Sequence, residues 1–219
     1  MQSNNAVFDK IIFDKKTSFA EIFESSIYQV SGICWDKYKT PKLGQLIQIK
    51  YSPTSEAETL IGCVTETLTE SIDPMKTPIA YQMTEEELQA EQPQIFEFLV
   101  SKFKAKIIGL CKEREILFSV PERPPNIHSF INYLDQDFAT NIVSDPEFFH
   151  TLLSGDTLSN LNNDELLLSI FRQISQSKPV SQNLIESFYN LYRTLLKNDA
   201  YKVRYFFKRL SKIIRIEGI

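Results

Sequence analysis

The stretch PERPP at residues 121–125 divides the chain into two halves whose hydrophobic patterns differ. Each proline fixes its own φ and biases the residue before it away from the helical region, so this stretch is predicted to be extended and stiff. Short apolar runs precede it, whereas apolar residues recur at helical spacing after it. We therefore predict an α+β fold, with a small β-barrel over residues 1–125 and an α-helical domain over residues 126–219.

The first half contains short runs that are rich in β-branched and aromatic residues, as is typical of strands. Turn-forming residues, such as Gly44 and the Pro53-Thr54-Ser55 cluster, lie between these runs. Several short strands at this spacing are typical of a barrel or a sandwich. The predicted strands cover residues 27–35, 45–51, 60–68, 103–111 and 115–120.

A helical insertion around residues 84–100 interrupts the strand pattern. Thr84 and Glu87 have the spacing of a capping box, in which each side chain binds a backbone amide of the other residue. Pro93 suits the first position of a second short helix. We expect this second helix to present Ile95, Phe96 and Leu99 to the barrel.

Helix signals continue through the second half of the chain. Asp145-Pro146 is predicted to begin a helix that ends at Gly155, and residues 164–174 form the next predicted helix. Ser181 is expected to cap a third helix, and the last helix is predicted over residues 199–215.

The last predicted helix is amphipathic. At 100° per residue, Val203, Phe206, Phe207, Leu210, Ile213 and Ile214 share one arc, which we expect to pack on the preceding helix. The opposite arc interleaves cations with tyrosines, and we call it the basic face. The basic face consists of Tyr201, Lys202, Arg204, Tyr205, Lys208, Arg209, Lys212 and Arg215.

The charge of the chain is divided unevenly, which favours a binding role for the basic face. Eight basic and two acidic residues lie from Arg193 onward, so residues 1–192 carry a net charge of −10 within a total of −4. The basic face is predicted to bind either an acidic protein surface or, as the alternative, nucleic acid. A membrane surface is the least favoured partner, and a purely solvated face near the helix C-terminus remains open.

The sequence contains few groups that known catalytic chemistries need. The two histidines, His128 and His150, are expected at the surface, and no HExxH, GxSxG, GxGxxG or P-loop motif occurs. The carboxylates Asp135 and Asp137 could act with His128 in a hydrolase or transferase, which is the weakest hypothesis. We therefore expect no enzyme activity, no metal site and no cofactor.

The three cysteines are far apart and lie among apolar neighbours. We expect Cys34, Cys63 and Cys111 to be reduced thiols in the core of a protein that works in a reducing compartment. The sequence has no apolar run long enough to span a bilayer, and its start lacks the apolar stretch of a signal peptide. These features predict a soluble protein of the cytoplasm, and frequent Ile, Lys and Asn make a plastid the alternative.

Residues 59–128 resemble the HAS-barrel, a small barrel shared by HerA-type helicases and ATP synthase subunits. The resemblance lies in the stretches TLIGCV at 59–64, QPQIF at 92–96, KIIG at 106–109 and RPPNIH at 123–128. The whole chain looks like a stand-alone HAS-barrel protein of the cyanobacterial or plastid type. In the larger relatives the barrel serves assembly and docking beside a P-loop motor, which this chain lacks. The resemblance therefore implies an accessory module without ATPase activity and leaves the oligomeric state open.

Overall fold

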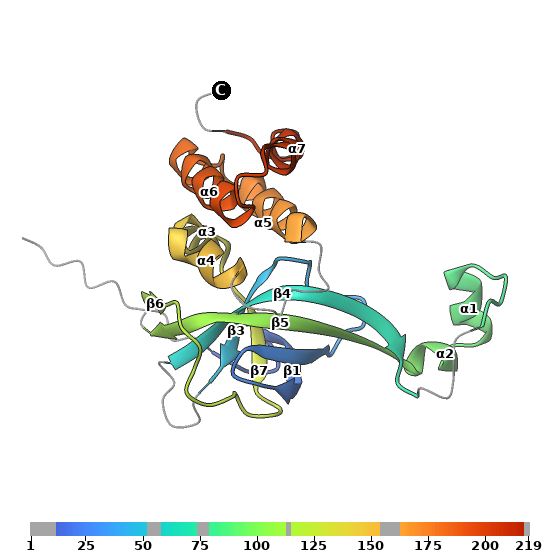
Figure 1. Ribbon diagram of the computed structural model, residues 1–219. Helices are drawn as coiled ribbons and strands as arrows, with labels where there is room; N and C mark the ends of the chain where they lie inside the picture. Colours follow the sequence, from blue (N-terminus) through green and yellow to red (C-terminus); the bar gives the residue numbers. More distant parts are fainter. Residues whose placement is uncertain (1–11, 52–57, 74–78, 113–114, 154–162, 217–219) are drawn as a thin grey trace, which may run out of the picture.

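The computed structural model describes residues 12–51, 58–73, 79–112, 115–153 and 163–216, and it consists of a β-barrel with most of its helices on one side (Figure 1). The strands are β1 (Ser18–Ser25), β2 (Gln29–Cys34), β3 (Leu46–Lys50), β4 (Glu58–Ser71), β5 (Leu99–Lys112), β6 (Glu115–Leu117) and β7 (Phe130–Tyr133). The helices are α1 (Glu85–Glu91), α2 (Gln94–Glu97), α3 (Gln136–Ser144), α4 (Pro146–Leu153), α5 (Asn163–Ser177), α6 (Gln182–Leu195) and α7 (Ala200–Leu210).

Six antiparallel strands close into a barrel in the order β1-β7-β3-β4-β5-β2, and β2 pairs again with β1. The short strand β6 only extends the end of β5 as a hairpin. Closure gives each of the six strands a neighbour on both sides over part of its length, which shortens the unpaired edges through which strands aggregate. The predicted α+β class with a β-barrel is confirmed.

Two barrel strands, β1 and β7, were not predicted from the sequence. Strand β7 follows the proline-rich stretch and lies between β1 and β3, so the barrel continues beyond the expected boundary at residue 125. Its Asn132 is buried, accepts a hydrogen bond from Ser18 Oγ at 2.6 Å and donates one to the Ile12 carbonyl at 2.9 Å. These bonds fix β7 against β1. A strand of four residues is too short to show a period in the sequence.

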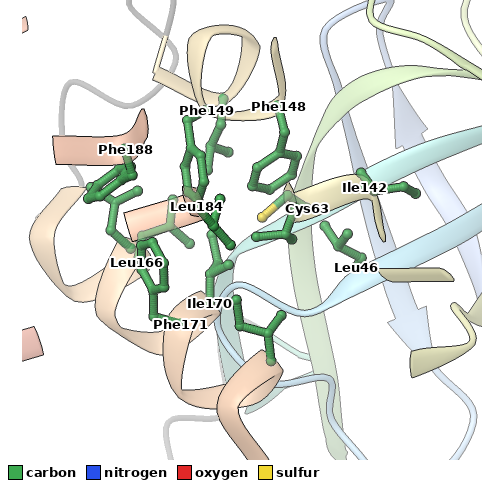
Figure 2. Packing of buried hydrophobic residues seen from close by; sticks show 14 of the residues in the cluster. Leu46, Cys63, Ile142, Phe148, Phe149, Leu166, Ile170, Phe171, Leu184 and Phe188 are labelled. Atoms are coloured by element: carbon green, nitrogen blue, oxygen red, sulfur yellow. The ribbon is translucent and has the colours of Figure 1, made fainter. Parts of the chain in front are cut away.

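The barrel has two apolar surfaces, namely its interior and the outer side of β3, β4 and β5, which packs against the helices. Leu60 and Phe103 belong to the cluster inside the barrel, whereas Ile61 and Cys63 belong to a second cluster between the barrel and the helices. Figure 2 shows Cys63 on the barrel side of this second cluster, next to residues of α3 and α4. Neighbouring residues of β4 therefore point to opposite sides, as the pleat of a strand requires.

The helices are held together by an aromatic cluster around Phe188 of α6, which is 1% exposed. Its ring centroid lies 4.7 Å from that of Phe149, 5.0 Å from that of Phe171 and 5.8 Å from that of Phe206. Each such pair adds to the free energy that burial alone provides. Phe206 comes from the predicted apolar arc of α7, so the prediction that this arc packs on the preceding helix is confirmed.

Lys106 of β5 connects the barrel to the end of α4. Its side chain is buried, and Nζ donates a hydrogen bond to the Leu152 carbonyl at 2.8 Å, in the last turn of α4. A cation there also interacts favourably with the helix dipole. Burial lowers the pKa of Lys106 below its usual 10.5, because the charged form loses hydration.

The helical insertion is confirmed, but its predicted packing is wrong. Thr84 and Glu87 form both bonds of the predicted capping box, at 3.2 and 2.8 Å. However, neither α1 nor α2 contains a buried residue, so Ile95 and Phe96 are not part of the barrel core, and Leu99 opens strand β5. The long strands β4 and β5 instead carry both helices out to the tip of an arm (Figure 1).

The structure also differs from the predictions at the end of α7 and in the presence of α3. Helix α7 ends at Leu210 and not at residue 215, because the chain turns so that Val180 N donates to the Arg215 carbonyl at 2.8 Å. Helix α3 was not predicted; Asp135 caps it by accepting a hydrogen bond from Phe138 N at 3.0 Å. The expected stop at Gly155 lies outside the described residues.

Candidate functional site: a basic groove between α6 and α7

The connection between α6 and α7 is a tight turn with two residues in the left-handed region. Lys197 and Asn198 have φ values of 52° and 61°. Arg193 Nε donates to Asn198 Oδ1 at 2.9 Å, and Asp199 accepts a hydrogen bond from Lys202 N at 3.2 Å as the N-cap of α7. This turn positions the start of α7 beside the last turn of α6.

A groove of about 800 Å³ lies between the two helices. We call it the basic groove, because cations are the charged residues that line it. Its lining consists of Tyr189, Arg193, Asn198, Ala200, Val203, Arg204, Phe207 and Lys208. The groove therefore combines apolar and aromatic side chains with charged ones, as in many small ligand and peptide sites.

The groove carries three positive charges, on Arg193, Arg204 and Lys208, and no carboxylate lines it. Within the described parts of the chain, no ion pair joins these three side chains to an acid. Like charges that share one groove raise its positive potential, and an anion bound there relieves their repulsion. The groove is therefore suited to an acidic ligand.

The structure divides the predicted basic face into parts with different environments. Arg204 and Lys208 line the groove, whereas Arg209 is half-buried and its Nη2 lies 2.6 Å from Glu165 Oε1. This hydrogen-bonded ion pair raises the pKa of Arg209. Lys202 Nζ lies 3.7 Å from Asp199 Oδ2, at the N-terminal end of α7.

The other members of the basic face are exposed outside the groove. Tyr201 is 80% exposed and Tyr205 is 54% exposed, so each presents an aromatic ring to solvent. Lys212 and Arg215 lie beyond the end of α7 and are also exposed. Of the eight predicted residues, Arg204 and Lys208 line the groove.

Sequence reasoning missed three residues that complete the groove: Tyr189, Arg193 and Asn198. Arg193 was counted in the basic C-terminal region but was not assigned to the face, because it belongs to α6. A usable signal was the asparagine shortly after a helix, since asparagine tolerates the left-handed conformation that reverses the chain. Such a turn brings the last turn of one helix beside the first turn of the next.

The residues considered for catalysis have other partners. His128 Nδ1 lies 3.4 Å from Glu21 Oε2, and His150 is exposed on α4, so the expectation of surface histidines is confirmed. Asp135 caps α3, and Asp137 Oδ1 lies 2.7 Å from Lys178 Nζ. The described residues do not contain three His, Cys, Asp or Glu side chains grouped to hold a metal ion.

Cys34, Cys63 and Cys111 are buried thiols, as predicted. Burial raises the pKa of Cys34 to about 11 and that of Cys63 to about 12. Cys34 and Cys63 are therefore protonated in the folded protein at neutral pH, and a protonated thiol is a poor nucleophile.

No protein-family model and no curated protein matches this chain. The resemblance to HAS-barrel proteins therefore stays a prediction. In the described segments, no helix has the length and apolar character that a membrane crossing requires.

Proposed function

We propose that the protein is a non-enzymatic adaptor whose basic groove binds an acidic segment of a partner protein. The observation that supports this proposal is the set of three cations, Arg193, Arg204 and Lys208, around a groove without a lining carboxylate. The acidic remainder of the chain repels polyanions over most of its surface, so the groove offers a local site for an acidic peptide.

The aromatic residues of the groove favour a peptide that combines acids with apolar side chains. Tyr189 is 39% exposed, and its ring lies 5.1 Å from that of Phe207 in an edge-on arrangement. Aromatic and arginine side chains dominate the energetics of many protein interfaces. A carboxylate can bind an arginine through two parallel hydrogen bonds, which adds geometric specificity to the charge attraction.

Nucleic acid is the second candidate partner, favoured by the exposed rings of Tyr201 and Tyr205 beside Arg204 and Lys208. Bases stack on such rings while cations contact phosphates. Each phosphate contact lowers the logarithm of the affinity by about 0.7–0.9 per tenfold rise in salt. A steep salt slope that falls when Arg204 and Lys208 are replaced by glutamine, together with a loss of affinity when the tyrosines are replaced by leucine, would favour nucleic acid over protein.

Two variants of equal charge change test the groove. The groove variant is R193Q/R204Q/K208Q, and the control variant K202Q/K212Q/R215Q removes three cations that do not line it. Each tagged protein is purified from its own cells, with and without nuclease. We expect a stoichiometric protein that survives nuclease, is retained by the control variant and is lost by the groove variant.

The captured protein is then purified and its binding segment is mapped. Two synthetic peptides of that segment are compared, one with its acidic residues and one with Asn and Gln in their place. Weaker binding of the second peptide would show that the groove recognises negative charge. If both variants retain the captured protein equally, the groove is not the docking site. If nuclease treatment removes the captured protein, nucleic acid is favoured as the partner.

A further inference from the structure

The helix α1 lies at the tip of the arm, and most of its residues are exposed. It has seven residues, none of them buried, and a helix this short is only marginally stable in water unless other groups support it. Its support within the chain comes from the Thr84–Glu87 capping box and a long hydrogen bond of 3.4 Å from Gln89 Nε2 to Tyr38 Oη. The arm thus presents an ordered element whose surface is available for a partner.

The surface of this arm tip is both acidic and apolar. Residues 79–98 contain five glutamates and no lysine or arginine. Among its large apolar side chains, Ile79 is 68% exposed, Phe98 is 43% exposed and Met83 is 39% exposed. Exposed apolar residues beside one sign of charge are typical of a binding surface.

The basic groove is complementary to the arm tip, because three cations and two aromatic side chains line it. We propose that the arm tip of one molecule docks in the basic groove of a second copy of this chain. The negative charges of the arm come from Glu85, Glu86 and Glu91, and they face the three cations of the groove. The exposed apolar side chains of the arm contact the aromatic residues of the groove. Glu87 remains engaged in the capping box.

The contact joins two molecules, because the arm tip lies far from α6 and α7 of its own chain (Figure 1). It therefore connects two different surfaces, arm to groove. A contact of this kind produces a ring if the rotation closes and an open chain of molecules if it does not. An interface of one short helix is small, so the association is weak and sensitive to salt.

Self-association and the proposed partner use the same groove, so each has its own diagnostic variant. The arm variant E85Q/E86Q/E91Q removes self-association but leaves the groove intact for the partner, and it retains Glu87 so that α1 keeps its cap. Its control, E115Q/E122Q/E147Q, changes three exposed glutamates elsewhere. If capture of a partner fails while self-association persists, only the proposed function is refuted.

Sedimentation velocity of the purified full chain measures the association. At protein concentrations up to about 200 µM, we expect oligomers at about 20 mM salt and monomers at about 500 mM salt. The control should behave like the wild type, whereas the arm variant and the groove variant R193Q/R204Q/K208Q should be monomeric in both buffers. A wild type that is monomeric throughout, or an arm variant that still associates, overturns the proposal.

A charge exchange between the two surfaces gives a stricter test. The variants E85K/E86K/E91K and R193E/R204E/K208E each place like charges on arm and groove, so each alone should be monomeric. In their mixture the lysine arm meets the glutamate groove, and the unchanged acidic arm of the second variant meets the unchanged basic groove of the first. Both contacts between unlike molecules are therefore complementary, and we expect the two variants to form a complex in a 1:1 ratio. Two variants that retain the circular dichroism of the wild type but do not form this complex would overturn the proposal.

Discussion

Replacing Cys63 by alanine should reduce the loss of stability that the protein suffers at alkaline pH. Cys63 is 0% exposed, and burial raises the pKa of its thiol from 9.0 to about 12. In the unfolded chain the thiol ionises near its ordinary pKa. Because the folded pKa is raised, the stabilisation is fully present below pH 9 and is lost as the pH rises toward the folded value.

The size of this effect follows from the two pKa values. At pH 10 about ten in eleven unfolded thiols are ionised, whereas the folded thiol is still protonated. The free energy of unfolding therefore falls by about 1 kcal/mol between pH 8 and pH 10 because of Cys63. Lys106, opposite Cys63 on β5, acts in the other direction, since its pKa is lowered by burial. Because Cys63 and Lys106 interact electrostatically, the difference between wild type and variant reports the thiol together with its effect on Lys106.

Urea unfolding at pH 8 and pH 10 in reducing buffer measures this difference. The single tryptophan, Trp35, packs edge-on against Phe130 of the barrel and provides the fluorescence signal. Val64→Ala serves as the control, because Val64 is also 0% exposed and next in the chain but does not titrate. We expect the control to lose as much stability with pH as the wild type. Equal losses in wild type and Cys63→Ala would refute the assigned pKa.

Three further predictions concern single side chains. Phe188→Ala should lower the free energy of unfolding by about 3–5 kcal/mol, because Phe188 is 1% exposed at the centre of the helical cluster; a loss below about 1 kcal/mol would contradict this packing. Thr84→Ala should cost α1 about 1 kcal/mol and speed amide exchange there, while the global unfolding midpoint stays unchanged because α1 buries no residue. Gly109→Ala should destabilise the protein by about 1–3 kcal/mol in chemical denaturation, since the added Cβ would lie 2.4 Å from the Leu117 carbonyl oxygen; a neutral effect would show that β6 can move aside.

Helix caps and amphipathic periods could be recognised in the sequence, because they depend on residues that are close together in the chain. The capping box at Thr84 and the cap at Ser181 are confirmed, because a cap depends on side chains within three residues of each other. The amphipathic period of α7 correctly gave its buried residues. Its C-terminal end was predicted too late, since the pairing of Val180 with Arg215 and Ile216 is a contact between distant residues.

Strand β7 and the arm show what a local pattern does not contain. Phe130–Tyr133 is a strand because β1 and β3 lie on either side of it in the closed barrel, and neither neighbour is adjacent in sequence. Ile95 and Phe96 have the spacing of a buried helix face, but the 14-residue strands β4 and β5 carry them away from the core. The hydrophobic period of a helix shows which side chains share a face, but not which surface that face packs against.

The sequence by itself determined the α+β class, the charge asymmetry and the residues that α7 presents to solvent, because each depends on composition or on spacing along one helix. Only the tertiary structure decided which cations act together. It pairs Arg209 with Glu165, and it places Arg193 of α6 beside Arg204 and Lys208 in the lining of the groove, across a left-handed turn. Electrostatic interactions depend on distance in space, and residues of two helices become neighbours only when those helices pack.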